Sequence, residues 1–350
     1  MPSSPNVSTA ETLTARKAFY DEIAKQHLAP LWERVSSLVT RSPESAARPV
    51  HWRYSEVRES LLDAGRLLTA EEAERRVLIL ENPGLPGQSQ ITDSLFSGLQ
   101  LLLPGERAGA HRHVASALRI FLEGSGAYTA VNGERTNMER GDFVITPNWT
   151  WHDHGNDGPH PVIWLDGLDV PIVNLFKTSF SEDGAGKDMP GGPRLGDSEA
   201  RFAGALLPDG SNASLSSPLL NYRYARARQS LAAMQLNGPV DPYHGVKLRY
   251  VNPLTGGPAM PTMSSALQLL PSGFSTLPYR STDGTVFVVI EGRGHSEIEA
   301  SPIKWVENDV FVAPSWALQR HYAESETVLF TFSDRAAQEK LGLWRDQRIP

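Results

Sequence analysis

The sequence predicts a mainly β protein with two small antiparallel β domains and an N-terminal helical arm. From Val77 onward, short apolar runs alternate with Gly, Pro and Asn-Gly turns, which is the pattern of antiparallel strands. The second half repeats the first, because Leu99-Gln100-Leu101-Leu102 recurs 168 residues later as Leu267-Gln268-Leu269-Leu270. Before Val77, the apolar residues have helical spacing.

The helical arm is expected over residues 1–75. Apolar residues follow a helical period in Ala15–Gln26, Leu31–Val39 and Ser55–Leu68, and prolines at positions 30, 43 and 49 separate these pieces. Because the arm lies outside both β stretches, we expect it to contribute to contacts between subunits.

The two β domains are expected over residues 76–180 and 241–350. The clearest strand patterns of the first domain are Leu99–Leu103, Leu118–Leu122, Tyr128–Val131, Phe143–Ile145 and Val162–Leu165. Residues 181–240 are expected to be a linker rich in Gly, Ser, Pro and Asp, which contains Gly191-Gly192-Pro193 and ends in a helix over Asn221–Leu236.

Further markers recur at nearly the same shift. Glu123-Gly124-Ser125-Gly126 returns as Glu291-Gly292-Arg293-Gly294, Asp142-Phe143-Val144 returns as Asp309-Val310-Phe311, and Trp149 matches Trp316. We therefore interpret the chain as one β domain present in two copies.

Composition excludes several classes of function. The 350 residues carry 40 acidic and 33 basic side chains, so the chain lacks the positive charge that non-specific nucleic-acid binding needs. With no cysteine, disulfides and thiolate metal sites are excluded. No apolar stretch long enough to cross a membrane and no targeting segment is apparent. We expect a cytoplasmic protein with neither nucleic-acid nor membrane partners.

Two histidine pairs are the strongest chemical signal. His111 and His113 form one pair, and His152 and His154 form the other. Residues two apart on a strand share a face, so facing strands can bring three imidazoles to one point, where they suit Fe, Cu, Ni or Zn. The alternative is a set of ordinary polar residues on a sheet.

The second copy provides an internal control. The positions of His111, His113 and His152 become Tyr279, Ser281 and Gln319, which are poor metal ligands as a set. We therefore expect the metal in the first copy only. Elsewhere in the second copy, His295 and His321 leave a weaker, independent site open.

Arg119 is the expected partner of a substrate carboxylate. Counting by two from His111 places it on the face of the histidines unless a bulge intervenes. A buried arginine needs an anion, which is either the substrate or an internal carboxylate such as Asp166.

The motifs around the histidines resemble the bicupins, and among them the gentisate 1,2-dioxygenase family with its salicylate and 1-hydroxy-2-naphthoate dioxygenases. The first cupin motif contains Gly105, His111, His113 and Gly124, and the second contains Gly141, Pro147, His152 and Asn156. Ala117 replaces the usual cupin Glu, as in that family, and Trp149 stands where cupins usually have Gly. Longer matched strings are Trp151–Asn156, Trp164–Asp169, Arg249–Gly257 and Phe332–Arg335.

The resemblance implies two double-stranded β-helix barrels and Fe(II) held by His111, His113 and His152. It further implies ring cleavage of gentisate (2,5-dihydroxybenzoate) with O2 to maleylpyruvate, by an enzyme that is often a homotetramer. Alternative substrates are salicylate and 1-hydroxy-2-naphthoate. The alternative from another class is a non-catalytic bicupin that binds a small ligand or stores nitrogen.

The resemblance also implies roles for single residues. His154 is expected beside the metal as a catalytic group, or else as a fourth ligand. Asp166 is expected to meet the ring hydroxyl opposite the chelating one, or else to be a structural partner of Arg119 or a backbone amide. Substrate contacts are expected from Arg119, Gln100, Arg75 and Trp151. The alternatives are a surface pair for Arg75 and its neighbour Arg76, a structural role for Gln100, which recurs as Gln268, and a place in the core for Trp151. Trp149 and Phe96 are expected to wall the pocket or to belong to the core.

Overall fold

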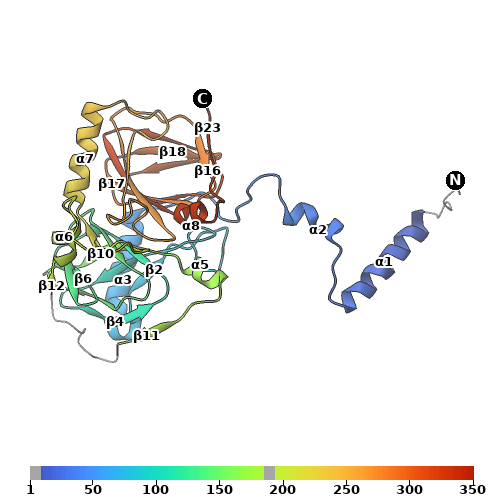
Figure 1. Cartoon of the computed structure of the whole chain (residues 1–350), viewed down its shortest axis with the longest axis horizontal. Coiled ribbons are helices and arrows are strands. Elements are labelled where there is room, and N and C mark those ends of the chain that lie inside the picture. Colours follow the sequence, from blue (N-terminus) through green and yellow to red (C-terminus); the bar gives the residue numbers. More distant parts are fainter. Residues whose placement is uncertain (1–8, 185–193) are drawn as a thin grey trace. The chain divides into compact units, whose positions relative to one another are not determined.

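The computed structural model describes residues 9–184 and 194–350, which form two compact units, Met1–Glu44 and Ser45–Pro350 (Figure 1). The predicted Gly191-Gly192-Pro193 lies outside the described residues. Among the described residues, no helix has the length and apolar character needed to span a bilayer. The domain boundaries expected at residues 75, 180 and 240 stay predictions.

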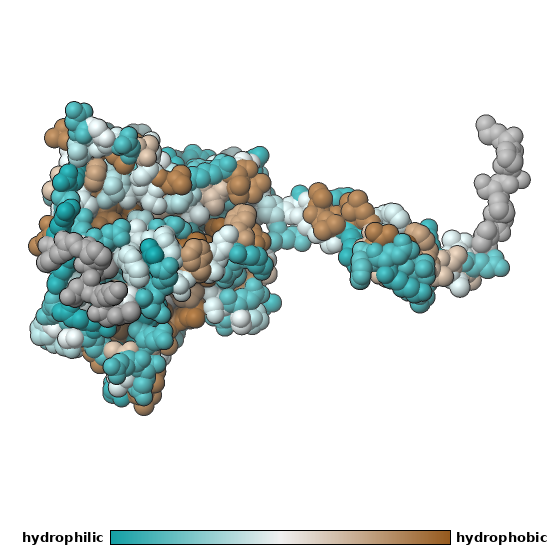
Figure 2. Space-filling model, turned by 60° about the horizontal axis from the view of Figure 1, so that its bottom comes forward, coloured by the Kyte–Doolittle hydropathy of each residue, from teal (hydrophilic) through white to brown (hydrophobic). Residues whose placement is uncertain are grey.

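The first unit consists of two helices, α1 (Thr9–Lys25) and α2 (Leu31–Leu38), separated at Pro30. Tyr20 ties them together, since its hydroxyl donates to Glu33 at 2.7 Å and accepts from Trp32 Nε1 at 3.0 Å. Apolar side chains are exposed along this unit (Figure 2), among them Leu31, Trp32 and Leu38. No residue of α2 is buried within the unit itself.

The second unit confirms the predicted mainly β class, because each half is a pair of sheets. The first half has the strand orders β13-β8-β5-β10-β3-β2 and β11-β4-β9-β6-β7-β12. Its strands are β2 (Val77–Ile79), β3 (Phe96–Leu102), β4 (Arg107–His113), β5 (Ala117–Glu123), β6 (Ala127–Val131), β7 (Glu134–Asn137), β8 (Phe143–Thr146), β9 (His152–Asn156), β10 (Val162–Leu168), β11 (Ser181–Asp183), β12 (Arg194–Leu195) and β13 (Asn221–Tyr222).

The second half repeats this plan with the orders β1-β20-β17-β22-β15-β14 and β19-β18-β21-β16-β23. Its strands are β1 (Val50–Trp52), β14 (Val246–Arg249), β15 (Ser264–Leu270), β16 (Tyr279–Ser281), β17 (Thr285–Glu291), β18 (Gly294–Ile298), β19 (Ser301–Trp305), β20 (Val310–Ala313), β21 (Gln319–Ala323), β22 (Thr327–Ser333) and β23 (Asp346–Arg348). The helices of the unit are α3 (Tyr54–Leu67), α4 (Ala70–Ala73), α5 (Val170–Leu175), α6 (Asp197–Phe202), α7 (Tyr224–Asn237) and α8 (Arg335–Lys340).

The two halves pack against each other through one sheet of each. Leu99 and Leu101 on β3 share a core with Leu267 and Leu269 on β15, whereas Leu102 faces the interior of the first half. Strands buried on both faces explain the nearly continuous apolar runs in the sequence. Phe143 and Phe330 meet directly across this contact, with ring centroids 5.4 Å apart.

The two halves also exchange short strands: the segment before each half contributes a strand to a sheet of the other half. Strand β1 pairs with β20 of the second half, and β13 pairs with β8 of the first half. The helices that follow begin on a carboxylate of the half that receives the strand: Asp309 accepts from the Tyr54 backbone N–H at 2.8 Å, and Asp142 accepts from that of Tyr224 at 2.9 Å. The recurrence of Asp142 as Asp309 therefore reflects helix capping.

The recurring Glu-Gly pairs have two physical causes. Gly124 and Gly292 both have positive φ, and a Cβ there would lie about 2.5 Å and 2.4 Å from the carbonyl oxygens of Pro161 and Glu326. Glu123 accepts from the hydroxyl of Tyr54 at 2.8 Å, while Glu291 accepts from that of Tyr224. These contacts show that the duplication begins before β3, at the segment containing β1 and α3.

Candidate metal centre

Three histidines converge inside the first half. Strand β4 contributes His111 and His113, and β9 contributes His152; their ring nitrogens all lie within 4.8 Å of one another. In the register of β4 with β9, Ala108 lies opposite His154 and His111 lies opposite His152, so β4 has one extra residue between them. This bulge turns His111 onto the interior face, where Ala110 would otherwise lie.

Backbone carbonyls orient all three rings. The Nδ1 atoms donate to Gly109 at 3.0 Å, to Ala115 at 2.7 Å and to Thr150 at 2.9 Å, for His111, His113 and His152 respectively. In this tautomer each Nε2 carries no proton, so its lone pair is free to bind a metal. His152 Nε2 is buried and has no hydrogen-bond partner among the described residues. A buried nitrogen with an unused lone pair is suited to binding a metal.

The rings are held neutral, as ligands must be. Burial, with the nearby Arg75 cation, lowers the pKa of His111 to about 3. Burial likewise lowers the pKa of His113 and places that of His152 well below its usual value. The chemistry of this donor set fits a divalent transition metal with open coordination positions.

Arg119, on β5, forms a buried ion pair with Asp166, on β10. Its Nε is 3.1 Å from Asp166 Oδ1, although neither atom completes a hydrogen bond among the described residues. Arg119 Nη1 donates to Thr146, and Trp164 Nε1 donates to Asp166 Oδ2 at 3.1 Å. Burial raises the pKa of Asp166 to about 6 and lowers that of Arg119. The structure thus contains the internal partner that was one of the two alternatives for this arginine.

Arg75 and Arg76 have different surroundings. Arg76 is buried, and its two terminal nitrogens donate to Glu106 at 2.8 and 2.7 Å. Arg75 has an exposed side chain and lines a pocket of about 420 Å³ together with His111 and Asp183. The structure therefore brings Arg75 to a pocket beside His111, whereas Arg76 is paired with Glu106, the residue before β4.

His154 is buried as well, but it lies outside the group of histidines that could share one metal. Its Nδ1 is 3.0 Å from Thr129 Oγ1, and that hydroxyl donates to Met138 Sδ at 3.5 Å. The hydroxyl therefore accepts from His154 Nδ1, which leaves Nε2 as an acceptor. In the second half, His321 occupies the corresponding place, 2.8 Å from Ser296 Oγ.

Gln100 also faces the interior, above an apolar floor. It is 2% exposed, and its Nε2 has no hydrogen-bond partner among the described residues. The floor consists of Leu102, Phe121, Ala127, Met138, Val144, Val162 and Trp164. A polar group that is buried without a partner is costly, so this amide is a candidate for binding a ligand.

The structure does not bring Trp151 to this group. Strand alternation turns it away from His152, and its ring stacks on Arg112, 4.8 Å from the guanidinium carbon to the ring centroid. The same guanidinium carbon also lies over the ring of Trp149, 4.3 Å from its centroid. Trp149 also contacts Phe180, with centroids 4.4 Å apart. Phe96 is half-buried at the start of β3.

Sequence reasoning missed three contributors: Thr129, Thr146 and strand β11. The strand pairs with β4, placing Asp183 opposite His111 at the start of the segment expected to be a linker. Threonines on strands carry no signal of their own, because β-branched residues are common there. All three contributors could have been found only from the pairing of strands.

Comparisons with known proteins agree with this site. The cupin domain family matches residues 98–169. A gentisate 1,2-dioxygenase of Aquipseudomonas alcaligenes is 54% identical over 335 residues, which cover 95% of this chain and 96% of that protein. A 5-aminosalicylate 1,2-dioxygenase of Comamonas sp. is 36% identical over 94% of this chain and 89% of that protein. The crystal structure of a salicylate 1,2-dioxygenase from Pseudoaminobacter salicylatoxidans with gentisate has a TM-score of 0.91 at 33% identity, covering 99% of this chain and 95% of that one.

Proposed function

This chain belongs to the gentisate 1,2-dioxygenase family of ring-cleaving bicupin enzymes, and we propose that it cleaves gentisate with O2 to maleylpyruvate at an Fe(II) site. The observation that carries the proposal is the cluster of three neutral imidazoles with cationic side chains beside it. The 54% identity to a gentisate enzyme favours gentisate over the substrates of the more distant relatives.

His111, His113 and His152 would hold the iron through Nε2, because their Nδ1 atoms are bonded to backbone carbonyls. When bound, Fe(II) supplies a Lewis acid that favours ionisation of a chelating phenol, together with the redox chemistry that O2 needs. Since the histidines carry no charge themselves, the site offers its full positive charge to an anionic aromatic acid.

Arg119 and Arg75 would bind and orient the substrate carboxylate. Both guanidinium groups lie close enough to His111 and His113 to lower the pKa values of those rings. Arg75 stands at the pocket mouth and can capture the acid from solvent, whereas Arg119 is fixed by Thr146 and Asp166 inside. A planar guanidinium matches a carboxylate better than an ammonium would.

His154 and Asp166 would handle protons on the ring hydroxyls. His154 presents Nε2 as an acceptor, and Thr129 and Met138 fix the ring in that tautomer. Burial, which raises the pKa of Asp166 to about 6, allows that carboxyl group to exchange a proton near neutral pH. Gln100 would contribute its free amide N–H to an oxygen of the substrate.

The test is oxygen uptake by the purified chain supplied with ferrous iron and each of three acids: gentisate, salicylate and 1-hydroxy-2-naphthoate. We expect rapid uptake with gentisate in a one-to-one ratio to substrate consumed, and maleylpyruvate as the product by mass spectrometry. Uptake with salicylate or 1-hydroxy-2-naphthoate but not with gentisate would overturn the substrate.

The variant His152→Ala should show no uptake, while His160→Ala, which changes an exposed histidine of the same half, should match the wild type. A protein that retains no metal and consumes no oxygen with any of the acids would instead be a non-catalytic bicupin.

Assembly and location complete the proposal. The exposed apolar residues of α1 and α2 favour association between copies, and we propose a homotetramer that works in the cytoplasm. Sedimentation of the purified enzyme tests the assembly directly.

A further inference from the structure

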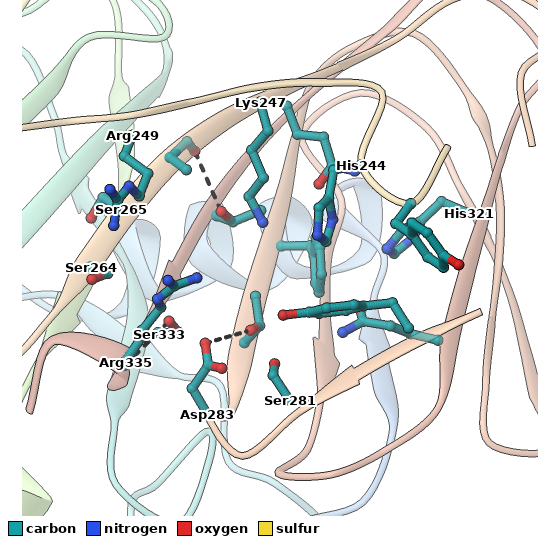
Figure 3. Close-up of a pocket in the computed structure, with 18 residues that line it drawn as sticks. His244, Lys247, Arg249, Ser264, Ser265, Ser281, Asp283, His321, Ser333 and Arg335 are labelled. Atoms are coloured by element: carbon teal, nitrogen blue, oxygen red, sulfur yellow. Dashed lines mark hydrogen bonds between the residues drawn. The ribbon is translucent and has the colours of Figure 1, made fainter. Parts of the chain in front are cut away.

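The second half has lost the metal ligands but has kept a polar cavity at the corresponding place. The cavity has a volume of about 60 Å³ and lies among β14, β15, β16, β21 and β22 (Figure 3). Its wall includes Tyr279, Ser281 and Gln319, which are the three residues at the positions of the histidine ligands.

Cations dominate this cavity. Lys247 and Arg249 reach it from β14, and Arg335 reaches it from the start of α8 (Figure 3). Asp283 is the carboxylate among the lining residues, and it is already engaged by Trp344 Nε1 at 2.8 Å and the Thr285 hydroxyl at 3.4 Å. Three cationic side chains thus face one carboxylate.

Two of these cations are unpaired. The backbones of Lys247 and Arg249 belong to the pairing of β14 with β15. Within residues 9–184 and 194–350, neither side chain makes a hydrogen bond or an ion pair, although Asp283 attracts Lys247 electrostatically. Arg335 does have a partner outside the cavity, because its Nε donates to Glu339 at 2.7 Å. Lys247 and Arg249 are exposed residues that line the cavity, and Lys247 also lines a neighbouring groove with His244 and Pro239.

Uncharged polar groups are unpaired as well. The hydroxyls of Ser264 and Ser265, the Gln268 Nε2 atom and the Gln319 Oε1 atom are buried without a hydrogen-bond partner among the described residues. Ser265 is 3% and Gln268 1% exposed. Apart from the Gln319 Oε1 acceptor, these atoms can donate hydrogen bonds. Unpaired donors and unpaired cations around one cavity favour a ligand that accepts hydrogen bonds and carries negative charge.

The size of the cavity limits the ligand. A volume of about 60 Å³ holds on the order of four water molecules, which is close to the number of heavy atoms in acetate or inorganic phosphate. A divalent metal does not fit the donor set, since positively charged side chains surround the site. We propose that the second half is an anion site, in which Lys247, Arg249 and Arg335 bind a small oxyanion such as a short-chain carboxylate or inorganic phosphate. The inference does not depend on the reaction of the first half.

The protonation state of Lys247 gives the site a pH dependence. Protein atoms packed around the Lys247 ammonium remove part of its hydration and, with Arg335 and Arg249 nearby, lower its pKa to about 8. An anion should therefore bind more weakly as the pH rises from about 7 to about 9, because binding requires the ammonium form. The other ionisable groups around Lys247 are Asp283, Asp241, Arg249, Arg335, His244 and His321, and burial keeps both histidines neutral with pKa values of about 2 and about 3.

Calorimetric titration of the full-length chain with sodium acetate and with sodium phosphate, at constant chloride, tests the proposal. We expect saturable binding of at least one anion to the wild type and a dissociation constant raised about tenfold or more in Lys247→Met. The matched control is Lys304→Met, an exposed lysine on β19, which should bind as the wild type does.

The comparison between variants separates this site from the first half, whose own cations are unchanged in all of them. If Lys247→Met does not fold, Arg249→Met is the second variant. The proposal is overturned if neither anion binds, or if each binds equally to the wild type and to the folded variant.

Discussion

Replacing Arg119 by Met tests the proposed binding of the substrate carboxylate. Arg119 is 4% exposed, so after its removal water cannot readily enter to bind the substrate carboxylate in its place. A buried hydrogen bond between charged groups contributes about 1.5–3 kcal/mol, which corresponds to about 10- to 150-fold in the Michaelis constant. Iron content should stay near the wild-type level, because none of the three ligands hydrogen-bonds Arg119.

The structure also supplies controls for this variant. Arg119→Met leaves Asp166 without its partner, and the already raised pKa of that carboxyl group will rise further, so the group becomes neutral. The double variant Arg119→Met/Asp166→Asn should therefore fold as the single variant does and have the same Michaelis constant. Arg112→Met changes an arginine on the opposite face of the strand, stacked on Trp151, and should alter the constant less than about twofold. An unchanged constant in Arg119→Met, or an equal rise in Arg112→Met, would refute the role.

Three further predictions concern the metal, the strand exchange and pH. His152→Ala should remain folded by circular dichroism but lose most of its iron by metal analysis, and retained iron would remove this residue from the ligand set. Asp309→Ala removes the acceptor for the first N–H of α3 and for His51, and should cost about 2 kcal/mol in urea unfolding, whereas the exposed Asp346→Ala should cost far less. A hydrogen bond from Arg58 holds the pKa of Glu123 below its usual 4.5, so its contribution to stability is present above that pH and is lost as the pH falls below it. The stability difference between wild type and Glu123→Gln should accordingly shrink from pH 6 to pH 3, and a constant difference would show that the ion pair contributes nothing.

The duplication, the fold class and the histidine cluster could be predicted because each leaves a local signal. The period-two pattern sets which side chains share a face, and the repeat marks which of them are absent from the second copy. The same alternation puts the side chains of Trp151 and His152 on opposite faces. The separation of Trp151 from the site could therefore have been predicted as well.

Other features depend on pairings between distant residues. Strand β1 spans Val50–Trp52, too short to show a period, and its partner β20 begins at Val310. Whether Arg119 meets Asp166 was undecided in the sequence, because it depends on the register of β5 with β10. The bulge that turns His111 inward has no distinct sequence mark apart from Gly109.

The exchange of strands β1 and β13 between the two halves affects how such a protein can evolve. Separating the halves would remove an outer strand from one sheet of each half and the carboxylate acceptor at the start of α3 and of α7, so neither copy is dispensable. Selection can therefore retain the second barrel for the support it gives to its twin, while its interior is released from holding a metal. A protein whose two duplicated halves support each other in this way can acquire a second binding function in one half while the other half keeps the first.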